Sequence, residues 1–187
     1  MQELPQTINA KHDYRIPHFI AESLEQVDFK RLSSLGIDTV ILDVDNTIVS
    51  YGKNDLRPAL AKYLISQLEN GYFNKLVLAT NATRDLGPII SVLKPDAVFQ
   101  RQGLVMKPFS AFYSRILKIL EVKPEQTVMI GDRLIQDIWG ARKVGMQSVL
   151  VEPLGKDLWV DKIILTRWLE RKILRRYVPK GIFSWFK

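Results

Sequence analysis

The stretch "DTVILDVDNTIVS", residues 38–50, passes from a continuously apolar segment into a polar turn that carries two carboxylates. An apolar run that does not alternate is typical of a strand in a parallel sheet covered on both faces, so we expect a buried strand over 39–43. Asp43 and Asp45 then stand together at the carboxyl end of this strand, where like charges repel unless a cation lies beside them. The stretch therefore predicts an α/β fold with a charged site at the strand end.

The rest of the chain repeats the alternation of apolar strands and helical patterns. The predicted strands are 75–80, 96–100, 127–131 and 148–152, and the predicted helices are 57–70, 82–93, 108–121 and 134–144. Strands separated by helical crossovers predict a doubly wound parallel sheet. We expect the first 20 residues to be an irregular lead-in and a further helix to span 22–34.

Composition limits the class of protein. The chain has 187 residues, 47% of them hydrophobic, which suffices for one well-buried core. It has no cysteine and two histidines, so a metal site would have to use oxygen ligands. We see no apolar run long enough to span a bilayer and no signal-peptide pattern, and we therefore expect a cytoplasmic protein.

Positive charge is concentrated at the C-terminal end. The formal net charge is +7, and residues 156–187 contain nine basic and three acidic residues. We therefore divide the chain into a catalytic domain over 1–155 and a basic C-terminal segment over 156–187, which would attract an anionic partner.

Polar residues also stand near the ends of other predicted strands. Thr80 and Asn81 end one strand, Lys107 precedes a helix, and Asp132 follows another strand with Asp137 five residues further on. Each is ordinary alone, as a cap or a solvated charge. Because ligands bind beyond the carboxyl ends of parallel strands, we expect these side chains to meet Asp43 and Asp45 in one site.

Two other interpretations of the paired aspartates were weighed. A calcium loop is excluded, because its required glycine would fall at Ile48 and its closing glutamate at Asn54. A polar turn that merely caps the strand stays open from this stretch alone.

The predicted site has a definite chemistry. The aspartates at 43, 45 and 132 would bind Mg²⁺, which prefers oxygen ligands. Asp43 would attack a phosphoryl group to form an aspartyl-phosphate, and Asp45 would act as general acid and base. Thr80, Asn81 and Lys107 would bind the phosphoryl oxygens, with Thr47 and Asp137 in supporting roles.

At these residues the chain resembles the haloacid dehalogenase superfamily of phosphatases. The resemblance rests on Asp43-Val44-Asp45-Asn46-Thr47, on Thr80, on Lys107, and on Gly131-Asp132 with Asp137. The second aspartate, Asp45, is present in the phosphatases of that superfamily and absent from its dehalogenases, so the resemblance implies a phosphatase.

More narrowly, residues 17–177 resemble the YqeG-type branch, which includes phosphatidylglycerophosphate phosphatases. This resemblance rests on "GIDTVILDVDNTIVSYG", "VMIGDRLIQDIWGARKVGM" and a basic end, "RWLERKILRR". It implies that the substrate is phosphatidylglycerophosphate at a membrane surface.

Two features of the sequence bear on the substrate independently. Only 32 residues separate Thr47 from Thr80 and 26 separate Thr80 from Lys107, which leaves no room for a cap domain and predicts an open site. In the C-terminal segment, a predicted helix has an apolar ladder opposite a basic one, and an aromatic tail follows. The apolar ladder is Leu165, Leu169, Ile173 and Tyr177, the basic one is Arg167, Arg171 and Arg175, and the tail contains Ile182, Phe183, Trp185 and Phe186. Aromatic residues beside cations suit an anionic membrane surface, so we expect peripheral association with the inner face of a membrane.

Three functional hypotheses follow. The first is the Mg²⁺-dependent phosphatase of a membrane lipid. The second keeps the enzyme but gives it a soluble sugar phosphate, a nucleotide or a phosphorylated macromolecule as substrate. The third is a non-catalytic protein that binds a membrane or RNA, which the complete set of site residues disfavours; no recognised nucleic-acid-binding motif accompanies the basic segment.

Overall fold

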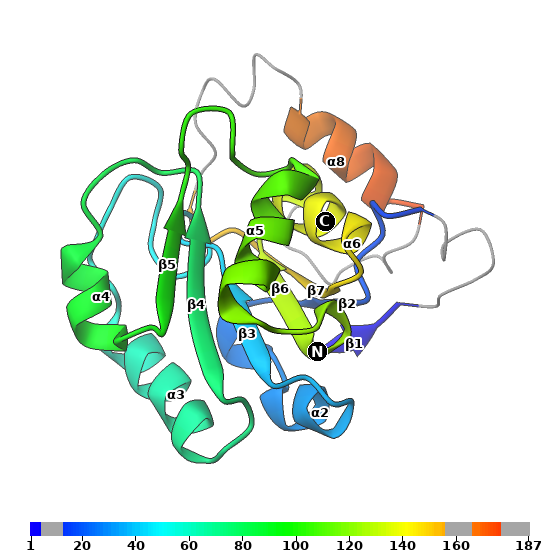
Figure 1. Ribbon diagram of the computed structural model, residues 1–187. Coiled ribbons are helices and arrows are strands. Elements are labelled where there is room, and N and C mark those ends of the chain that lie inside the picture. The colour runs from blue at the N-terminus through cyan, green and yellow to red at the C-terminus, as the bar shows by residue number, and fades with distance from the viewer. Residues whose placement is uncertain (5–12, 156–165, 177–187) are drawn as a thin grey trace.

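The computed structural model describes residues 1–4, 13–155 and 166–176, which build a seven-stranded sheet with helices on both of its faces (Figure 1). The strand order is β1-β2-β7-β6-β3-β4-β5, and every neighbouring pair is parallel except β1 with β2. The strands are β1 (Gln2–Glu3), β2 (Phe19–Ala21), β3 (Thr39–Leu42), β4 (Lys75–Thr80), β5 (Ala97–Gln100), β6 (Thr127–Gly131) and β7 (Gln147–Val151). The predicted α/β class and parallel sheet are confirmed.

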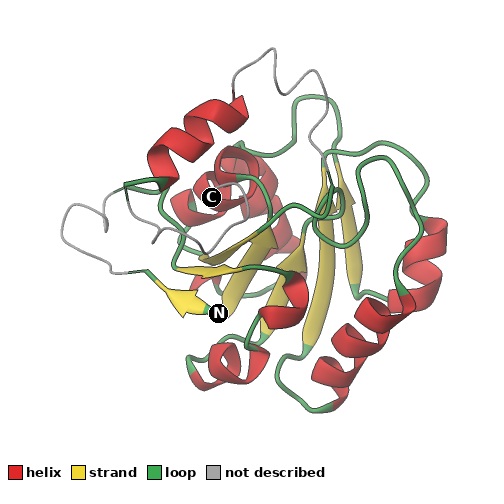
Figure 2. Cartoon of the chain, turned by 180° about the vertical axis from the view of Figure 1, so that it is seen from behind, coloured by secondary structure: helices red, strands yellow, loops and turns green. Residues whose placement is uncertain are grey.

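The sheet is covered on both sides because its central strands are apolar on both faces. Val40 and Leu42 of β3 pack in one core cluster, whereas Ile41 between them packs in another. The first cluster lies under α2 (Phe29–Ser34), α3 (Pro58–Glu69) and α4 (Gly87–Leu93), and the second lies under α5 (Ser110–Leu120) and α6 (Gly140–Lys143). Figures 1 and 2 show these two helical layers from opposite sides.

Three single-turn or irregular helices complete the domain. They are η1 (Leu24–Gln26), η2 (Pro124–Gln126) and the π-helical η3 (Leu134–Trp139). The predicted helix over 134–144 is therefore a π-helical segment that continues into α6. A π-helical turn widens the helix locally and is frequently found at functional sites.

The N-terminal prediction was wrong in two respects. Residues 1–20 are not wholly irregular, since β1 lies in them and β2 begins in them; β2 pairs in parallel with β7. The helix predicted over 22–34 is only η1 followed by the six-residue α2, because the Asp28 carboxylate caps a new helix by accepting the Arg31 N–H at 2.8 Å.

The helix predicted over 82–93 begins later than expected. The chain leaves β4 as a loop, and α4 begins only at Gly87, whose N–H donates to the Asp85 carboxylate at 2.9 Å. Pro88, near the start of α4, fixes the backbone in a helical conformation there. The extra loop places residues 82–86 at the carboxyl end of the sheet.

The C-terminal helix α8 (Thr166–Leu174) packs on the domain. Leu174 is buried in a cluster with Leu134 and Ile138 of η3, and Glu170 is also buried. Leu169, predicted to lie on the same face as Ile173, is 44% exposed, so the packed face is rotated from the predicted ladder. Leu165, Tyr177 and the predicted aromatic tail lie outside the described residues. Among the described residues, no helix has the length and apolar composition needed to span a bilayer.

Candidate active site

A pocket of about 430 Å³ opens at the carboxyl end of the central strands. The loops after β3, β4 and β6 supply its walls, so the strand ends meet there as predicted. Within the continuous stretch 13–155, these connections contain no cap domain, as the sequence spacing predicted. The lining residues are Asp43, Asp45, Asn46, Tyr51, Gly52, Thr80, Asn81, Ala82, Thr83, Arg84, Asp132, Arg133 and Gln136.

A buried ionic cluster forms the inner part of this site. The Lys107 ammonium donates to the carboxylates of Asp43 and Asp137, at 2.6 Å in the case of Asp137. Lys107 is 2% exposed, and Asp137 is fully buried. Asp132 joins them, because its carboxylate and those of Asp43 and Asp137 have oxygens within 4.8 Å of one another. The structure thus brings together residues from the segments that follow β3, β5 and β6.

Burial and neighbouring charge set the protonation of this cluster. Burial raises the pKa of Asp43 from 3.8 to about 8; Lys107 opposes this rise, and Asp137 and Asp132 add to it. Burial lowers the pKa of Lys107, but the carboxylates of Asp137 and Asp43 outweigh this effect and raise it overall. Lys107 therefore stays a cation, whereas Asp43 needs more positive charge nearby to ionise fully at neutral pH.

Asp137 positions Lys107, and its carboxylate is itself held by close contacts with the backbone of β6 and η3. Its second carboxylate oxygen accepts the Arg133 N–H at 2.9 Å, and its own backbone lies in the π-helical η3. A Cβ atom at Gly131 would overlap the Asp137 carboxylate, so only glycine fits at the end of β6. The spacing of Gly131 and Asp137 predicted from sequence is thus a packing requirement as well as a chemical one.

The polar residues after β3 and β4 hold the cluster in place. Asn81 exchanges two hydrogen bonds with the Lys107 backbone, one to its carbonyl oxygen and one from its N–H, both at 2.9 Å. The Thr47 hydroxyl donates to Asp43 at 3.3 Å. The Thr80 hydroxyl oxygen accepts the Ala82 N–H at 3.0 Å, which leaves its hydrogen available for another acceptor. The roles of Thr80 and Asn81 in phosphate binding stay predictions.

Asp45 takes a different position from Asp43. Its carboxylate accepts the Gly52 N–H at 2.8 Å and an N–H of the Arg84 guanidinium at 2.9 Å, and a second guanidinium nitrogen lies 2.8 Å from its other oxygen. Arg84 is held in turn by Asn54, whose side-chain oxygen accepts from its Nε at 3.0 Å. Asp45 thus lies on the pocket wall, and it is not among the three carboxylates that approach one another. Its predicted role as a metal ligand stays a prediction.

The inner cluster fits a divalent cation. The carboxylates of Asp43, Asp132 and Asp137 gather there, and the Lys107 ammonium contacts two of them, so a bound cation would reduce the repulsion among the acidic groups. All of the donor atoms are oxygens, which Mg²⁺ prefers. Asp43 and Asp132 also line the pocket, whereas Asp137 is fully buried and is engaged by Lys107 and the Arg133 N–H. Asp43 and Asp132 are therefore the ligands that this geometry favours.

Sequence reasoning missed two residues that shape the site. Arg84 carried no signal, since nothing in "ATNATRDLG" points to a contact with Asp45. Glu170 of α8 is 2% exposed and reaches the start of η3, where it accepts the Ile135 N–H at 3.1 Å and lies 3.6 Å from the Arg133 Nε. A signal existed here, because Glu170 is the one acidic residue between positions 162 and 187.

Comparisons with known proteins agree with this geometry. A HAD-hydrolase-like family model matches residues 105–154, which include Lys107, Asp132 and Asp137. The probable phosphatase YqeG of Bacillus subtilis is 24% identical over 91% of this chain and 95% of its own length. These matches support a phosphatase of the haloacid dehalogenase superfamily.

Two further matches are to a curated relative and to a solved structure. A chloroplastic phosphatidylglycerophosphate phosphatase of Chlamydomonas reinhardtii is 22% identical over 89% of this chain, which spans 64% of that protein. The crystal structure of an uncharacterised protein from Listeria monocytogenes superposes with a TM-score of 0.51 and 19% identity, covering 73% of this chain and 99% of that one. The second match concerns the fold alone.

Proposed function

We propose that this protein is an Mg²⁺-dependent phosphomonoester hydrolase that removes the terminal phosphate of phosphatidylglycerophosphate at a membrane surface. The observation that carries the phosphatase chemistry is the buried cluster, in which Lys107 joins Asp43 to Asp137 beside Asp132 at the inner end of an open pocket. The likeness to the Chlamydomonas phosphatase supports the choice of lipid.

In the first half of the proposed reaction, Asp43 is the nucleophile. A carboxylate oxygen of Asp43 bonds to the phosphorus while the bond from phosphorus to the leaving oxygen breaks. Lys107 and Thr47 hold the Asp43 carboxylate in one orientation, so little reorganisation is needed for attack. Asp45 gives its proton to the leaving oxygen, which departs as an alcohol.

In the second half, Asp45 is the base. It takes a proton from a water molecule that attacks the phosphorus of the aspartyl-phosphate, and the bond to Asp43 breaks to release inorganic phosphate. Arg84 and the Gly52 N–H fix the Asp45 carboxylate toward the pocket. In this proposal the hydroxyl hydrogen of Thr80 and the Lys107 ammonium stabilise charge on the phosphoryl oxygens.

The metal supplies charge to both halves. Mg²⁺ bound at Asp43 and Asp132 would neutralise the phosphoryl oxygens and favour the ionised form of the nucleophile. The raised pKa of Asp43 supports this requirement, because the carboxyl group is buried among two further acidic groups.

A panel of phosphate esters tests the proposal. Phosphatidylglycerophosphate in mixed micelles is compared with soluble sugar phosphates, nucleotides and a small chromogenic ester, each with Mg²⁺ and with a chelator. We expect Mg²⁺-dependent release of phosphate, with the lipid turned over best, and loss of turnover by a factor of about 10⁴ or more in Asp43→Asn. Preference for a soluble ester would replace the lipid assignment, and normal turnover by Asp43→Asn would refute the nucleophile.

A further inference from the structure

The loop between β5 and α5 forms a rigid hairpin with an apolar tip. Gln102 and Val105 exchange backbone hydrogen bonds at 3.0 and 2.9 Å, which closes a tight turn over Gly103 and Leu104. Arg115 of α5 donates to the Gln102 side chain and anchors the turn. Leu104 is 85% exposed, the highest value among the large exposed hydrophobic residues of the described chain.

The hairpin also carries a positive charge beside its apolar residues. Arg101 is exposed, and its Nε donates to the Gly103 carbonyl oxygen at 3.2 Å, which keeps the guanidinium near the turn. Phe109, at the base of the hairpin, is 52% exposed. The hairpin therefore presents two exposed apolar side chains, Leu104 and Phe109, together with a basic one.

The outward face of α8 has the same combination of side chains. Trp168 is 58% exposed, and the Lys172 ammonium lies 5.1 Å from the centre of its ring. Leu169 is exposed beside them, and Arg175 and Arg176 are exposed just beyond the helix. Glu170 is the one acidic residue in the described range 166–176, and it is buried against η3. The outward face therefore presents aromatic, apolar and basic groups without an exposed carboxylate.

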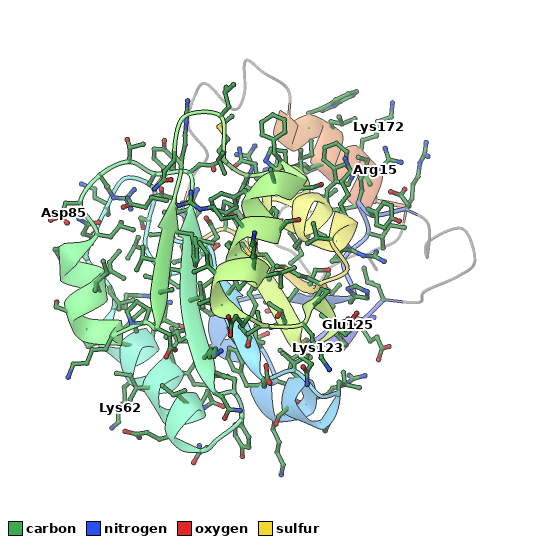
Figure 3. The ribbon with its side chains drawn as sticks, in the orientation of Figure 1. Arg15, Lys62, Asp85, Lys123, Glu125 and Lys172 are labelled. Atoms are coloured by element: carbon green, nitrogen blue, oxygen red, sulfur yellow. The ribbon has the colours of Figure 1, made fainter. Side chains whose placement is uncertain are left out.

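Both features lie at the end of the molecule that holds the pocket. The hairpin follows β5 and α8 packs on η3, and both lie at the top in Figures 1 and 2, which view the chain from opposite sides. Figure 3 shows Lys172 at this end, whereas Lys62, Lys123 and Glu125 lie toward the other end. The hairpin tip and α8 thus lie at the same end of the sheet as the pocket.

We propose that the hairpin tip at Leu104 and the outward face of α8 form a two-part surface that docks on an anionic phospholipid bilayer, with the pocket turned toward the headgroups. The inference deepens the proposed function, because it supplies the surface by which a lipid phosphate would reach Asp43 without leaving the membrane. It also assigns membrane contact to the β5–α5 connection, which is distant in sequence from the basic C-terminal segment.

The chemistry of this surface favours a bilayer over other partners. An apolar tip and a tryptophan buried to headgroup depth gain hydrophobic free energy, and neighbouring basic side chains gain electrostatic free energy from anionic lipids. The two apolar parts come from separate elements, so they make two point contacts with a plane instead of a continuous groove for a peptide.

Binding to vesicles tests the surface, and the full chain is used throughout. Sedimentation is measured with vesicles of phosphatidylcholine mixed with phosphatidylserine, lipids that are neither substrate nor product. Leu104→Gln is compared with Leu35→Gln, because Leu35 is 56% exposed at the end of α2, which lies at the other end of the sheet (Figure 1). Lys172→Glu is compared with Lys62→Glu, which makes the same change of charge on α3.

We expect Leu104→Gln and Lys172→Glu each to weaken vesicle binding by about tenfold, while the two control variants bind like the unmodified protein. All four variants should hydrolyse a small soluble ester at the original rate, which confirms that they fold. Equal binding by Leu104→Gln and the unmodified protein would overturn the proposal. Equal losses in the test and control variants, or retention on RNA or protein but not on vesicles, would overturn it as well.

These outcomes are separate from those of the proposed function. If micellar phosphatidylglycerophosphate is hydrolysed but the variants leave vesicle binding unchanged, the phosphatase assignment stands and the docking surface fails. If the variants weaken vesicle binding but the lipid is not hydrolysed, the docking surface stands and the substrate assignment fails.

Discussion

Asp43 and Asp45 are two residues apart in sequence, yet they lie in different electrostatic environments. Asp43 is in a buried cluster with Lys107, where burial raises its pKa to about 8. Asp45 is on the pocket wall with Arg84, and their side chains are 16% and 24% exposed. The comparison teaches that the inner group is held by low-dielectric ionic contacts and the outer group by contacts that water partly screens. These environments suit a nucleophile and a proton carrier respectively.

The largest expected difference between the two regions is in stability. Lys107→Gln leaves the buried Asp43 and Asp137 without their cation, so we expect the free energy of unfolding to fall by about 3 to 5 kcal/mol and activity to be lost. Arg84→Gln, the matched change in the outer pair, should cost about 1 kcal/mol or less. Urea unfolding of both variants measures this difference. Equal losses would show that the two regions do not differ in the way the burial indicates.

The second prediction is a variant that loses activity but keeps the stability of the fold. Asp45→Asn keeps the shape of the side chain but cannot carry the transferred proton, so kcat should fall by a factor of about 10² to 10⁴. The unfolding midpoint should stay close to that of the unmodified protein, because the lost ion pair is partly exposed. Steady-state kinetics on a small phosphate ester, together with urea unfolding, checks both parts. Unchanged kcat would remove Asp45 from the proposed reaction.

The third prediction uses the protonation of Asp43 in the metal-free protein. Its pKa is raised from 3.8 to about 8, so the folded protein holds a proton that the unfolded chain releases between these values. Through this group, the free energy of unfolding falls as the pH rises across that window. Since Mg²⁺ binds the ionised carboxylate, its stabilising effect should increase over the same range.

Thermal unfolding at about pH 6 and about pH 8.5, with Mg²⁺ and with a chelator, measures this effect. We expect the rise in Tm caused by Mg²⁺ to be larger at the higher pH. Asp43→Asn cannot ionise, so it should lose most of the increase with pH. The same rise in Tm at both pH values in the unmodified protein would contradict a metal site that includes Asp43.

The smallest expected effect comes from the link between α8 and the inner region. Glu170 contacts the Arg133 side chain and the Ile135 N–H, and the Arg133 N–H donates to Asp137. Glu170→Gln keeps an acceptor for Ile135 but loses the charge, so kcat should fall about three- to tenfold with little change in KM. The kcat of Glu170→Ala should fall further, because the acceptor for the Ile135 N–H is lost as well. Kinetics of the two variants beside Lys172→Gln tests whether the link positions the inner region, and equal rates in all three would refute it.

The comparison also shows how far sequence reasoning reached. The apolar runs at β3 to β7 were recognised because strands covered on both faces have no polar side. The short β2 was missed because three apolar residues resemble many loops, and its place in the sheet depends on pairing with β7. The start of α4 was wrong because the Asp85 turn competes with a helix of similar local propensity.

Sequence by itself predicted which residues meet at the site. Thr80 and Asp132 were expected near Asp43 because parallel strands place their carboxyl ends at one edge, and Lys107 was expected there because it follows another strand of the sheet. Only the tertiary structure decided that Asp43 lies in the buried cluster with Lys107 while Asp45 lies on the pocket wall with Arg84. Asn46 adopts a left-handed conformation with a φ of 61°, and the chain turns away from β3 after Asp43. That turn, together with long-range contacts from Arg84 and Glu170, depends on packing between distant segments, which local sequence patterns do not encode.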